Sequence, residues 1–354
     1  MLHRHLLGTT ALALLATITA GCGGFSQEND EAPQDARSAI VARPPQFVIL
    51  SFDGSYTLSF WRESRAFAAA NNLKLTYFIS GVYFIPNEAR SGYIAPRRGP
   101  GVSAIGWGGT PDEIAERFEE VRMAAAEGHE IASHANGHFD GSSWSASEWT
   151  SEFDQFDKII FEGVGVTAPP LGFGARDIMG FRAPQLGHGP GLYEALRNRG
   201  YAYDASRTGR ATDWPKNIDG IWNFPLAELR IVGSGRATLS MDYNFYFADS
   251  RASPDPAGKE RYKKQMIDTY MAYFEGNYFG NRAPLHIGHH FSRWNGGAYW
   301  EAMQAFAVRV CGLPEVTCGT YKDLVQFVEE HEAELRDFQA GNFPAMPRSP
   351  AGEP

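Results

Sequence analysis

The sequence predicts an α/β domain whose largely parallel sheet is curled into a distorted (β/α) barrel. Apolar runs of strand length alternate with helical stretches over residues 46–340, and this alternation is typical of a parallel sheet covered by helices. The number of these elements suits a closed or distorted barrel. The 354 residues show no internal repeat, and the apolar fraction of 43% is ample for a buried core.

Each element is predicted from a local pattern. The run at residues 47–52 is continuously apolar, as expected for a strand covered on both faces. The helix after residue 110 has the clearest start, because Thr110, Pro111 and Glu113 supply an N-cap, a first-turn proline and a capping-box glutamate. Gly128 ends that helix. The other predicted strands are 75–79, 130–133, 221–226, 238–243 and 284–289, and the other predicted helices are 58–70, 192–198, 261–274, 298–310 and 322–338.

The amino-terminal segment is typical of an exported protein. Arg4 precedes an apolar run at 6–18 and several small residues, so residues 1–21 are predicted to be a secretory signal peptide. The run ends at Cys22 within Thr-Ala-Gly-Cys, which resembles the lipobox of bacterial lipoproteins with Thr in place of the usual Leu. We expect a lipid anchor on Cys22 that associates the protein with a membrane, in the periplasm or cell envelope of a bacterium. The alternative is an ordinary cleaved signal peptide.

The domain boundaries follow from composition. Residues 22–45 are rich in polar residues, Gly and Pro and are expected to form a tether. Residues 46–340 are expected to form the barrel domain, and residues 341–354 a flexible tail. The formal net charge of −9 argues against a nucleic-acid partner, since phosphate binding needs a dense basic surface.

Two further features concern the surface of the domain. Cys311 and Cys318 are close in sequence, and in an oxidising compartment we expect them to form a disulfide, with two buried thiols as the alternative. Residues 81–109 form a long insertion rich in Gly and aromatic residues. Long loops often cover a functional face, although a purely stabilising surface loop has the same appearance.

Two polar clusters follow predicted strands, where barrel enzymes place their catalytic groups. Asp53 comes directly after the first strand, although Asp-Gly also marks ordinary turns. His134 and His138 follow the strand at 130–133. If residues 134–138 form a helical turn, the two imidazoles share one face and can bind one divalent ion, for which Zn²⁺, Co²⁺ and Ni²⁺ are suitable. Two unrelated surface histidines would give the same spacing.

Three more clusters supply a cation, carboxylates and further imidazoles. Arg182 offers a rigid fork of donors suited to holding a carboxylate. Asp204 and Asp213 are each candidate partners for Arg182, or else ordinary turn residues. The last predicted barrel strand ends in His289 and His290, which strand alternation places on opposite sides.

In this order, the clusters resemble the polysaccharide deacetylases of carbohydrate esterase family 4, over roughly residues 46–300. The family's motif Thr-Phe-Asp-Asp-Gly is similar to residues 51–55, and its paired histidines are similar in spacing to residues 134–138. Its Arg-x-Pro-Tyr-Gly motif begins in the same way at residues 182–184, and the chain departs from it at Gln185 and Leu186. Asp213-Trp214 looks like the fourth motif and residues 284–290 like the fifth, while residues 200–206 and 241–244 add a chitin-deacetylase-like similarity.

The resemblance implies a distorted barrel and a metal-assisted hydrolysis. A divalent metal on His134 and His138 would polarise the acetyl carbonyl and activate water. Asp53 would be the general base, held ionised by Arg182, with Asp213 behind the arginine.

The resemblance leaves two assignments open. His290 is favoured slightly over His289 as the acid that protonates the departing amine. The family uses two adjacent aspartates, the first as base and the second as metal ligand, but Gly54 occupies the second place here. Asp53 is therefore either the base, which leaves the metal two protein ligands, or itself a metal ligand.

The expected function is removal of N-acetyl groups from an N-acetylhexosamine polymer such as peptidoglycan or a chitin-like or capsular glycan. Two alternatives remain open: removal of O-acetyl groups from a polysaccharide, and a catalytically weak lipoprotein that binds glycans.

Overall fold

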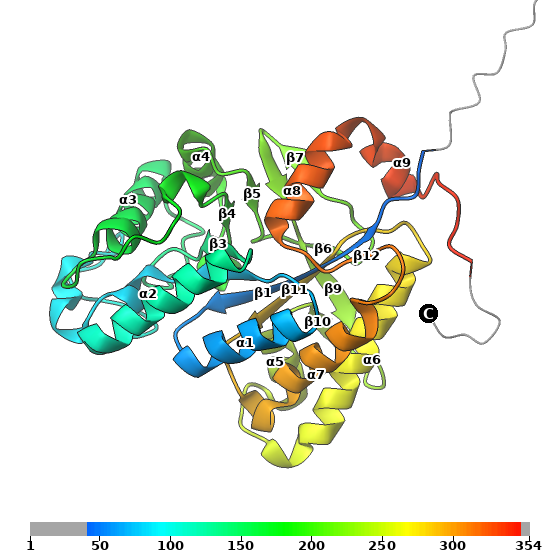
Figure 1. The fold of residues 1–354 in the computed structure, drawn as a ribbon, viewed down its shortest axis with the longest axis horizontal. Helices are drawn as coiled ribbons and strands as arrows, with labels where there is room; N and C mark the ends of the chain where they lie inside the picture. Colours follow the sequence, from blue (N-terminus) through cyan, green and yellow to red (C-terminus); the bar gives the residue numbers. More distant parts are fainter. Residues whose placement is uncertain (1–40, 348–354) are drawn as a thin grey trace, which may run out of the picture. The chain divides into compact units, whose positions relative to one another are not determined.

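A computed structural model describes residues 41–347, which form an α/β domain with a curled parallel sheet covered by helices (Figure 1). The predicted signal peptide, Cys22 and most of the predicted tether lie outside the described residues, as do residues 348–354 of the predicted tail. The strands are β1 Gln46–Gly54, β2 Thr76–Ile79, β3 Glu130–Ser133, β4 Gly180–Phe181, β5 Tyr203–Asp204, β6 Thr208–Arg210, β7 Lys216–Ile218, β8 Ile221–Asn223, β9 Leu226–Arg230, β10 Ala237–Leu239, β11 Leu285–His290 and β12 Val316–Thr317.

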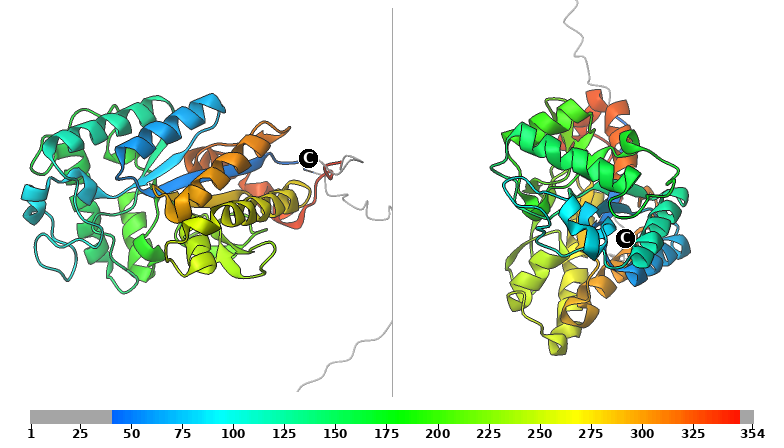
Figure 2. Two further views of the ribbon diagram at one scale, coloured as in Figure 1. Left: turned by 90° about the horizontal axis from the view of Figure 1, so that it is seen from below. Right: turned by 90° about the vertical axis from the view of Figure 1, so that its left-hand side faces the viewer.

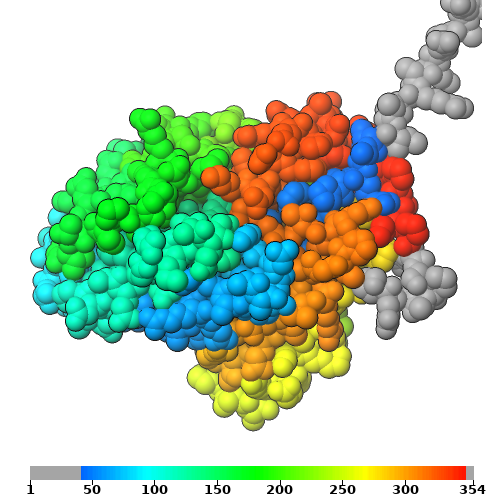
Figure 3. Space-filling view, viewed as in Figure 1, coloured from blue at the N-terminus to red at the C-terminus, as the bar shows by residue number. Residues whose placement is uncertain are grey.

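The helices lie outside the strands, as the view from the left of Figure 1 shows (Figure 2, right). They are α1 Leu58–Ala70, α2 Pro111–Ala126, α3 Ala146–Asp157, α4 Pro190–Arg199, α5 Asp242–Ser250, α6 Lys259–Tyr278, α7 Trp294–Val310, α8 Tyr321–Glu330 and α9 Leu335–Ala340. On the face seen in Figure 3, α1 and α2 lie side by side, joined by ion pairs from Arg62 and Arg65 to three glutamates. Among residues 41–347, no helix has the length and hydropathy needed to cross a membrane.

The main sheet has the order β11-β1-β2-β3-β4-β5-β8-β7, and β12 also pairs with β1. The strands from β11 to β8 pair in parallel, while β7 pairs antiparallel with β8. A second sheet has the order β10-β9-β6, and just after β10 an isolated bridge joins Met241 to Gly288 of β11. The sheet is thus a distorted half-barrel, which confirms the predicted fold class.

Strand β1 shows how the core sets the position of the site. Val48, Leu50 and Phe52 belong to the main core cluster, whereas Ile49 belongs to a second cluster on the other face of the strand. Because side chains alternate along a strand, Asp53 lies on the same face as Ile49. That face is also the side on which Tyr321 of α8 packs.

Several predicted boundaries agree with the structure. The helix predicted at 58–70 is α1, the strand at 130–133 is β3, and the capping box of Thr110 and Glu113 begins α2. The helix predicted at 298–310 is the regular part of α7, because the left-handed residues near the start of α7 end at Gly297. The bridge predicted between Cys311 and Cys318 is present.

Three predicted elements were wrong in their extent. The strand predicted at 221–226 is two strands, β8 and β9, separated at Pro225, which has no N–H to donate to a ladder. The strand predicted at 238–243 ends at Leu239, and α5 begins at Asp242. The helix predicted at 322–338 is broken after Glu330, and its second part packs Phe338 on Trp214 with ring centroids 5.1 Å apart.

Candidate active site

Asp53 lies at the carboxyl end of β1, between the neighbouring strands β11 and β2. Its Cα is paired in register with that of His290 on one side and Phe78 on the other. Immediately after it, Gly54 and Ser55 turn the chain with positive φ values of 87° and 64°. The carboxyl group is buried, with the residue 5% exposed, and faces a cavity at this end of the sheet.

Arg182, just after β4, is fully buried and holds Asp53 in place. Its Nη1 donates to Asp53 Oδ1 at 2.7 Å and to Ser51 Oγ at 3.0 Å. Its Nη2 donates to Tyr321 Oη at 3.1 Å, and the guanidinium lies 4.3 Å above the ring of Phe78. Burial alone would raise the pKa of Asp53, but the charge of Arg182 is the main opposing influence and the net pKa is lowered. Asp53 is therefore an ionised carboxylate with Oδ2 free of hydrogen bonds to the described residues.

His134 and His138 lie together, but not on a helical turn. The segment after β3 is an irregular loop in which Ala135 and His138 have φ values of 54° and 59°, which corrects the predicted backbone. The two ring centroids are nevertheless 5.2 Å apart. The left-handed residues bring the second imidazole back toward the first, and such strained positions often occur at functional sites.

The protonation state of His134 follows from its neighbours. Its Nδ1 is 2.7 Å from the carbonyl oxygen of Arg182, and since a carbonyl only accepts, Nδ1 carries the proton. Its Nε2 is buried and has no hydrogen-bond partner. Burial lowers the pKa of His134 to about 3, so the ring is neutral. A neutral imidazole whose second nitrogen is fixed by a carbonyl has the form of a metal-ligating histidine.

These residues fit a divalent metal in part. The unpartnered Nε2 of His134, the nearby ring of His138 and the carboxylate of Asp53 are the donor types that Zn²⁺ and its neighbours bind. However, no group of three His, Cys, Asp or Glu side chains within residues 41–347 is close enough to hold a metal as it stands. Gly54, which follows Asp53, has no side chain to supply a further donor.

His290, at the end of β11, faces the cavity and is paired with Asp242. Its Nδ1 donates to Asp242 Oδ1 at 2.7 Å, and its backbone N–H donates to Asp242 Oδ2 at 2.8 Å. Burial lowers the pKa of His290, but the carboxylate of Asp242 more than offsets this and the net pKa is raised. His290 therefore holds its proton more strongly than an ordinary histidine, and it can serve as a proton donor in the cavity.

His289 is on the opposite side of the same strand. It is fully buried, its Nε2 lies 3.2 Å from the hydroxyl of Tyr270, and burial lowers its pKa to about 4. It does not line the cavity. Of the two histidines, only His290 can reach a substrate there.

The structure does not place either predicted aspartate beside Arg182. Asp213 accepts hydrogen bonds from Arg210, at 2.8 Å from Nη2, and so its predicted role behind Arg182 was wrong. Asp204 accepts hydrogen bonds from Tyr193 and Ser206. The partners of Arg182 are Ser51 and Tyr321 instead, and the second aspartate of the site is Asp242.

The cavity between these groups has a volume of about 640 Å³. Polar groups and aromatic and aliphatic side chains both line it. Tyr83 and Ile105 come from the insertion at residues 81–109, which therefore covers part of this face. The lining residues are Asp53, Gly54, Ser55, Tyr56, Tyr83, Ile105, His134, His138, Ala183, Gln185, Leu186, Met241, Tyr243, Asn244, His290, Phe291, Ser292 and Trp294.

The site defines a barrel protein that presents a carboxylate, two clustered imidazoles and a carboxylate-supported histidine to one cavity. A family model described as Polysaccharide deacetylase matches residues 41–203. Over this part of its length the chain is similar to the polysaccharide deacetylase family. The matched part includes Asp53, His134, His138 and Arg182 and ends before Asp242.

Solved structures support the same fold. A Mycobacterium smegmatis protein that is assigned as a polysaccharide deacetylase is 14% identical to this chain, with a TM-score of 0.50. The match covers 83% of this chain and 96% of the Mycobacterium smegmatis chain. A Pseudomonas aeruginosa PAO1 protein with a similar assignment is 14% identical with a TM-score of 0.51, covering 82% of this chain and 92% of its own. A search of curated proteins finds no match.

Proposed function

We propose that the protein is a metal-dependent polysaccharide deacetylase that hydrolyses N-acetyl groups on an N-acetylhexosamine polymer. Peptidoglycan, a chitin-like glycan and a capsular glycan are the candidate substrates. The observation that carries the proposal is the buried, unpartnered Nε2 of the neutral His134, next to His138 and in the same cavity as Asp53. A buried polar atom without a partner is costly unless something binds it.

The chain's own residues supply the proton transfers. Asp53, kept ionised by Arg182, is the general base that takes a proton from water through its free Oδ2. His290, held by Asp242, donates a proton to the departing amine. An amine leaves poorly without that proton, whereas an alcohol needs it less, and so a supported acid favours an amide over an ester substrate.

The cofactor is part of the proposal. His134 and His138 would hold the metal, with Asp53 as a third donor if it does not act as base. Zn²⁺ is the favoured ion, with Co²⁺ and Ni²⁺ as alternatives. When bound there, the cation supplies Lewis acidity toward the acetyl group.

A second candidate function rests on Gly54. Because this glycine leaves the metal without the family's additional carboxylate, a weakly catalytic or non-catalytic protein that binds glycans is the competing proposal. The predicted leader and Cys22 support a further proposal, that the protein is an exported lipoprotein of the bacterial cell envelope.

The test measures metal content and acetate release on the purified full chain. We expect bound metal and acetate from N-acetylglucosamine oligomers, and loss of both in His134→Ala. His331→Ala is the matched control, since His331 stacks on Phe327 and does not line the cavity.

Each alternative has its own result. Acetate from acetylated xylan but not from N-acetylglucosamine oligomers would replace the N-deacetylase with an O-deacetylase. No acetate from either substrate, with no bound metal, would overturn the enzyme and leave the glycan-binding protein.

A further inference from the structure

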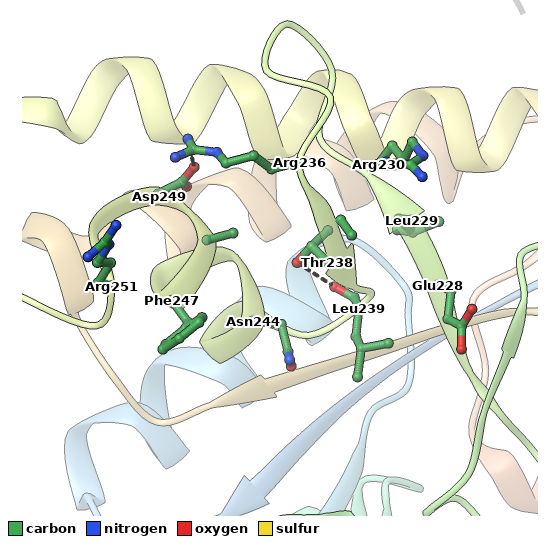
Figure 4. A pocket seen from close by; sticks show the side chains of 12 residues that line it. Glu228, Leu229, Arg230, Arg236, Thr238, Leu239, Asn244, Phe247, Asp249 and Arg251 are labelled. Atoms are coloured by element: carbon green, nitrogen blue, oxygen red, sulfur yellow. Dashed lines mark hydrogen bonds and ion pairs between the residues drawn. The ribbon is translucent and has the colours of Figure 1, made fainter.

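A second hollow, of about 900 Å³, lies beside the catalytic cavity, over α5 and the strands β9 and β10 (Figure 4). The two hollows are neighbours, because Asn244 lines both. The proposed hydrolysis uses none of the groups that belong to the second hollow alone. An extended polymer whose acetyl group lies at His290 has a path into it along α5.

Exposed aromatic rings follow this path. Tyr243, 43% exposed, lines the catalytic cavity, and Phe247, 59% exposed, lines the second hollow. The two are four residues apart on α5 and therefore lie on one face, with Cβ atoms about 6 Å apart. In Figure 4 the side chains of Phe247 and Asn244 project from the same side of the helix. The flat faces of two exposed aromatic rings on one side of a helix suit the C–H faces of sugar rings.

The lining of the second hollow has one more cationic than anionic side chain, in contrast to the negative net charge of the chain as a whole. It is lined by three arginines, Arg230, Arg236 and Arg251, and by two acidic residues, Glu228 and Asp249. Asp249 forms an ion pair with Arg236 at 3.3 Å, as Figure 4 shows, so these two charges offset each other and Arg230 and Arg251 face the single carboxylate of Glu228. The formal net charge of the whole chain is −9. A local cationic surface on an acidic protein selects for an anionic ligand.

Of the three arginines, Arg251 is the one best placed to bind that ligand. It is exposed, and its side chain has no hydrogen bond or ion pair with the described residues. Its backbone is in the left-handed region, with φ of 55°, at the end of α5. A guanidinium binds a carboxylate through two parallel N–H donors, which a lysine cannot reproduce.

We propose that this hollow is an accessory subsite for a carboxylate-bearing sugar of the same polymer, with Phe247 stacking on the ring and Arg251 binding the carboxylate. The proposal rests on the proposed function, because it assumes that a glycan enters the adjacent catalytic cavity. It restricts the substrate class to acidic N-acetylated polysaccharides, in which acetylated amino sugars and acidic sugars are neighbours.

The experiment compares binding of two hexasaccharides to the full chain by calorimetry. One alternates glucuronate with N-acetylglucosamine, and the other is N-acetylglucosamine alone. We expect the acidic hexamer to bind more tightly, and its advantage to shrink as salt is raised. Arg251→Gln should reduce the ratio of the two affinities about three-fold, the effect of one exposed charged contact. Phe247→Ala should weaken both hexamers by about five-fold.

The matched control is Arg309→Gln, which removes one exposed arginine from the end of α7, away from both hollows. It should leave the affinity ratio unchanged. Equal binding of the two hexamers by the native protein would overturn the subsite, and so would an equal effect of the Arg251 and Arg309 changes. These outcomes are separate from acetate release. Selective binding without hydrolysis would overturn the proposed deacetylase and keep the subsite. Hydrolysis without selective binding would keep the deacetylase and overturn the subsite.

Discussion

Asp242 accepts two hydrogen bonds from one residue, His290: one from the imidazole Nδ1 at 2.7 Å and one from the backbone N–H at 2.8 Å. The carboxylate therefore fixes both the position of the ring and its proton, leaving Nε2 directed away from Asp242 as the atom that can exchange protons with a substrate. The two residues are 48 positions apart, and they meet because α5 begins where β11 ends.

The first prediction concerns Asp242→Asn. The pKa of His290 is raised because the negative charge of Asp242 outweighs the effect of burial. A general acid is active below its pKa, so the native enzyme should stay active to higher pH than a histidine of ordinary pKa would allow. Removing the charge should move the alkaline limb of the kcat profile about one pH unit lower.

The control for this prediction is Asp268→Asn on α6, where Asp268 pairs with Lys264. It should keep the native profile. An unchanged alkaline limb in Asp242→Asn would show that His290 is not the acid whose ionisation limits the rate.

Short-range signals in the sequence were enough for much of the fold. The capping box at Thr110 and the apolar run of β1 predicted those elements at their observed positions. Strands β4 and β5 have two residues each, too few to show a period, and their assignment depends on neighbours in the sheet. Helix α3 was missed although Ser145 and Glu148 form a capping box that could have revealed it.

The site was predictable only where its residues follow a recognisable strand. Asp53, His134 and His290 each follow a predicted strand, so their convergence could be expected from the fold. Asp242 lies within residues 238–243, which were predicted as one strand, and Tyr321 begins a helix far along the chain. Neither carries a local signal for its role, because both act through partners that only the tertiary structure brings close.

The second prediction concerns the buried pair of Arg182 and Asp53. Arg182→Met leaves Asp53 as an uncompensated buried charge and removes the donors to Ser51 and Tyr321. The free energy of unfolding should fall by about 3 kcal/mol or more, measured by urea denaturation. Adding Asp53→Asn should recover part of that loss, because the remaining partner is then neutral.

Arg210→Met is the matched control, since Arg210 forms an exposed pair with Asp213. It should change the free energy of unfolding by less than about 1 kcal/mol. If the two arginine variants were equally stable, or if the Arg182 and Asp53 changes were additive, the pair would not be coupled as the structure indicates.

The third prediction concerns Glu130, a fully buried carboxyl behind the sheet. Burial raises its pKa to about 7, although Tyr203, Thr76 and the backbone N–H of Lys322 donate hydrogen bonds to it. Because the pKa in the folded protein exceeds that in the unfolded chain, the folded protein holds this proton more strongly. Its contribution to stability is therefore present below about pH 4.5 and is lost as the pH rises toward 7.

Glu130→Gln removes this titration while keeping the shape of the side chain. Between pH 5 and pH 8, as probe conditions, the stability of the variant relative to the native protein should rise by about 2 kcal/mol in urea denaturation. Glu332→Gln, at an exposed position, should show no such trend. A constant difference between Glu130→Gln and the native protein at both pH values would mean that Glu130 does not titrate in this range.

The last prediction concerns the bridge between Cys311 and Cys318, which closes a short loop after α7. Within that loop, β12 pairs with the start of β1, and the carbonyl of Cys318 accepts a hydrogen bond from the backbone N–H of Lys74. The loop spans seven positions, so the entropy removed from the unfolded chain is modest, and replacing both cysteines by serine should cost about 2 kcal/mol.

Urea denaturation of the native protein with and without reductant supplies the control, because the reduced native protein should match the double variant. The bridge lies away from the cavity, and so acetate release at 25 °C, a probe temperature, should be unaffected. Loss of activity without loss of stability would contradict this separation of the bridge from the site.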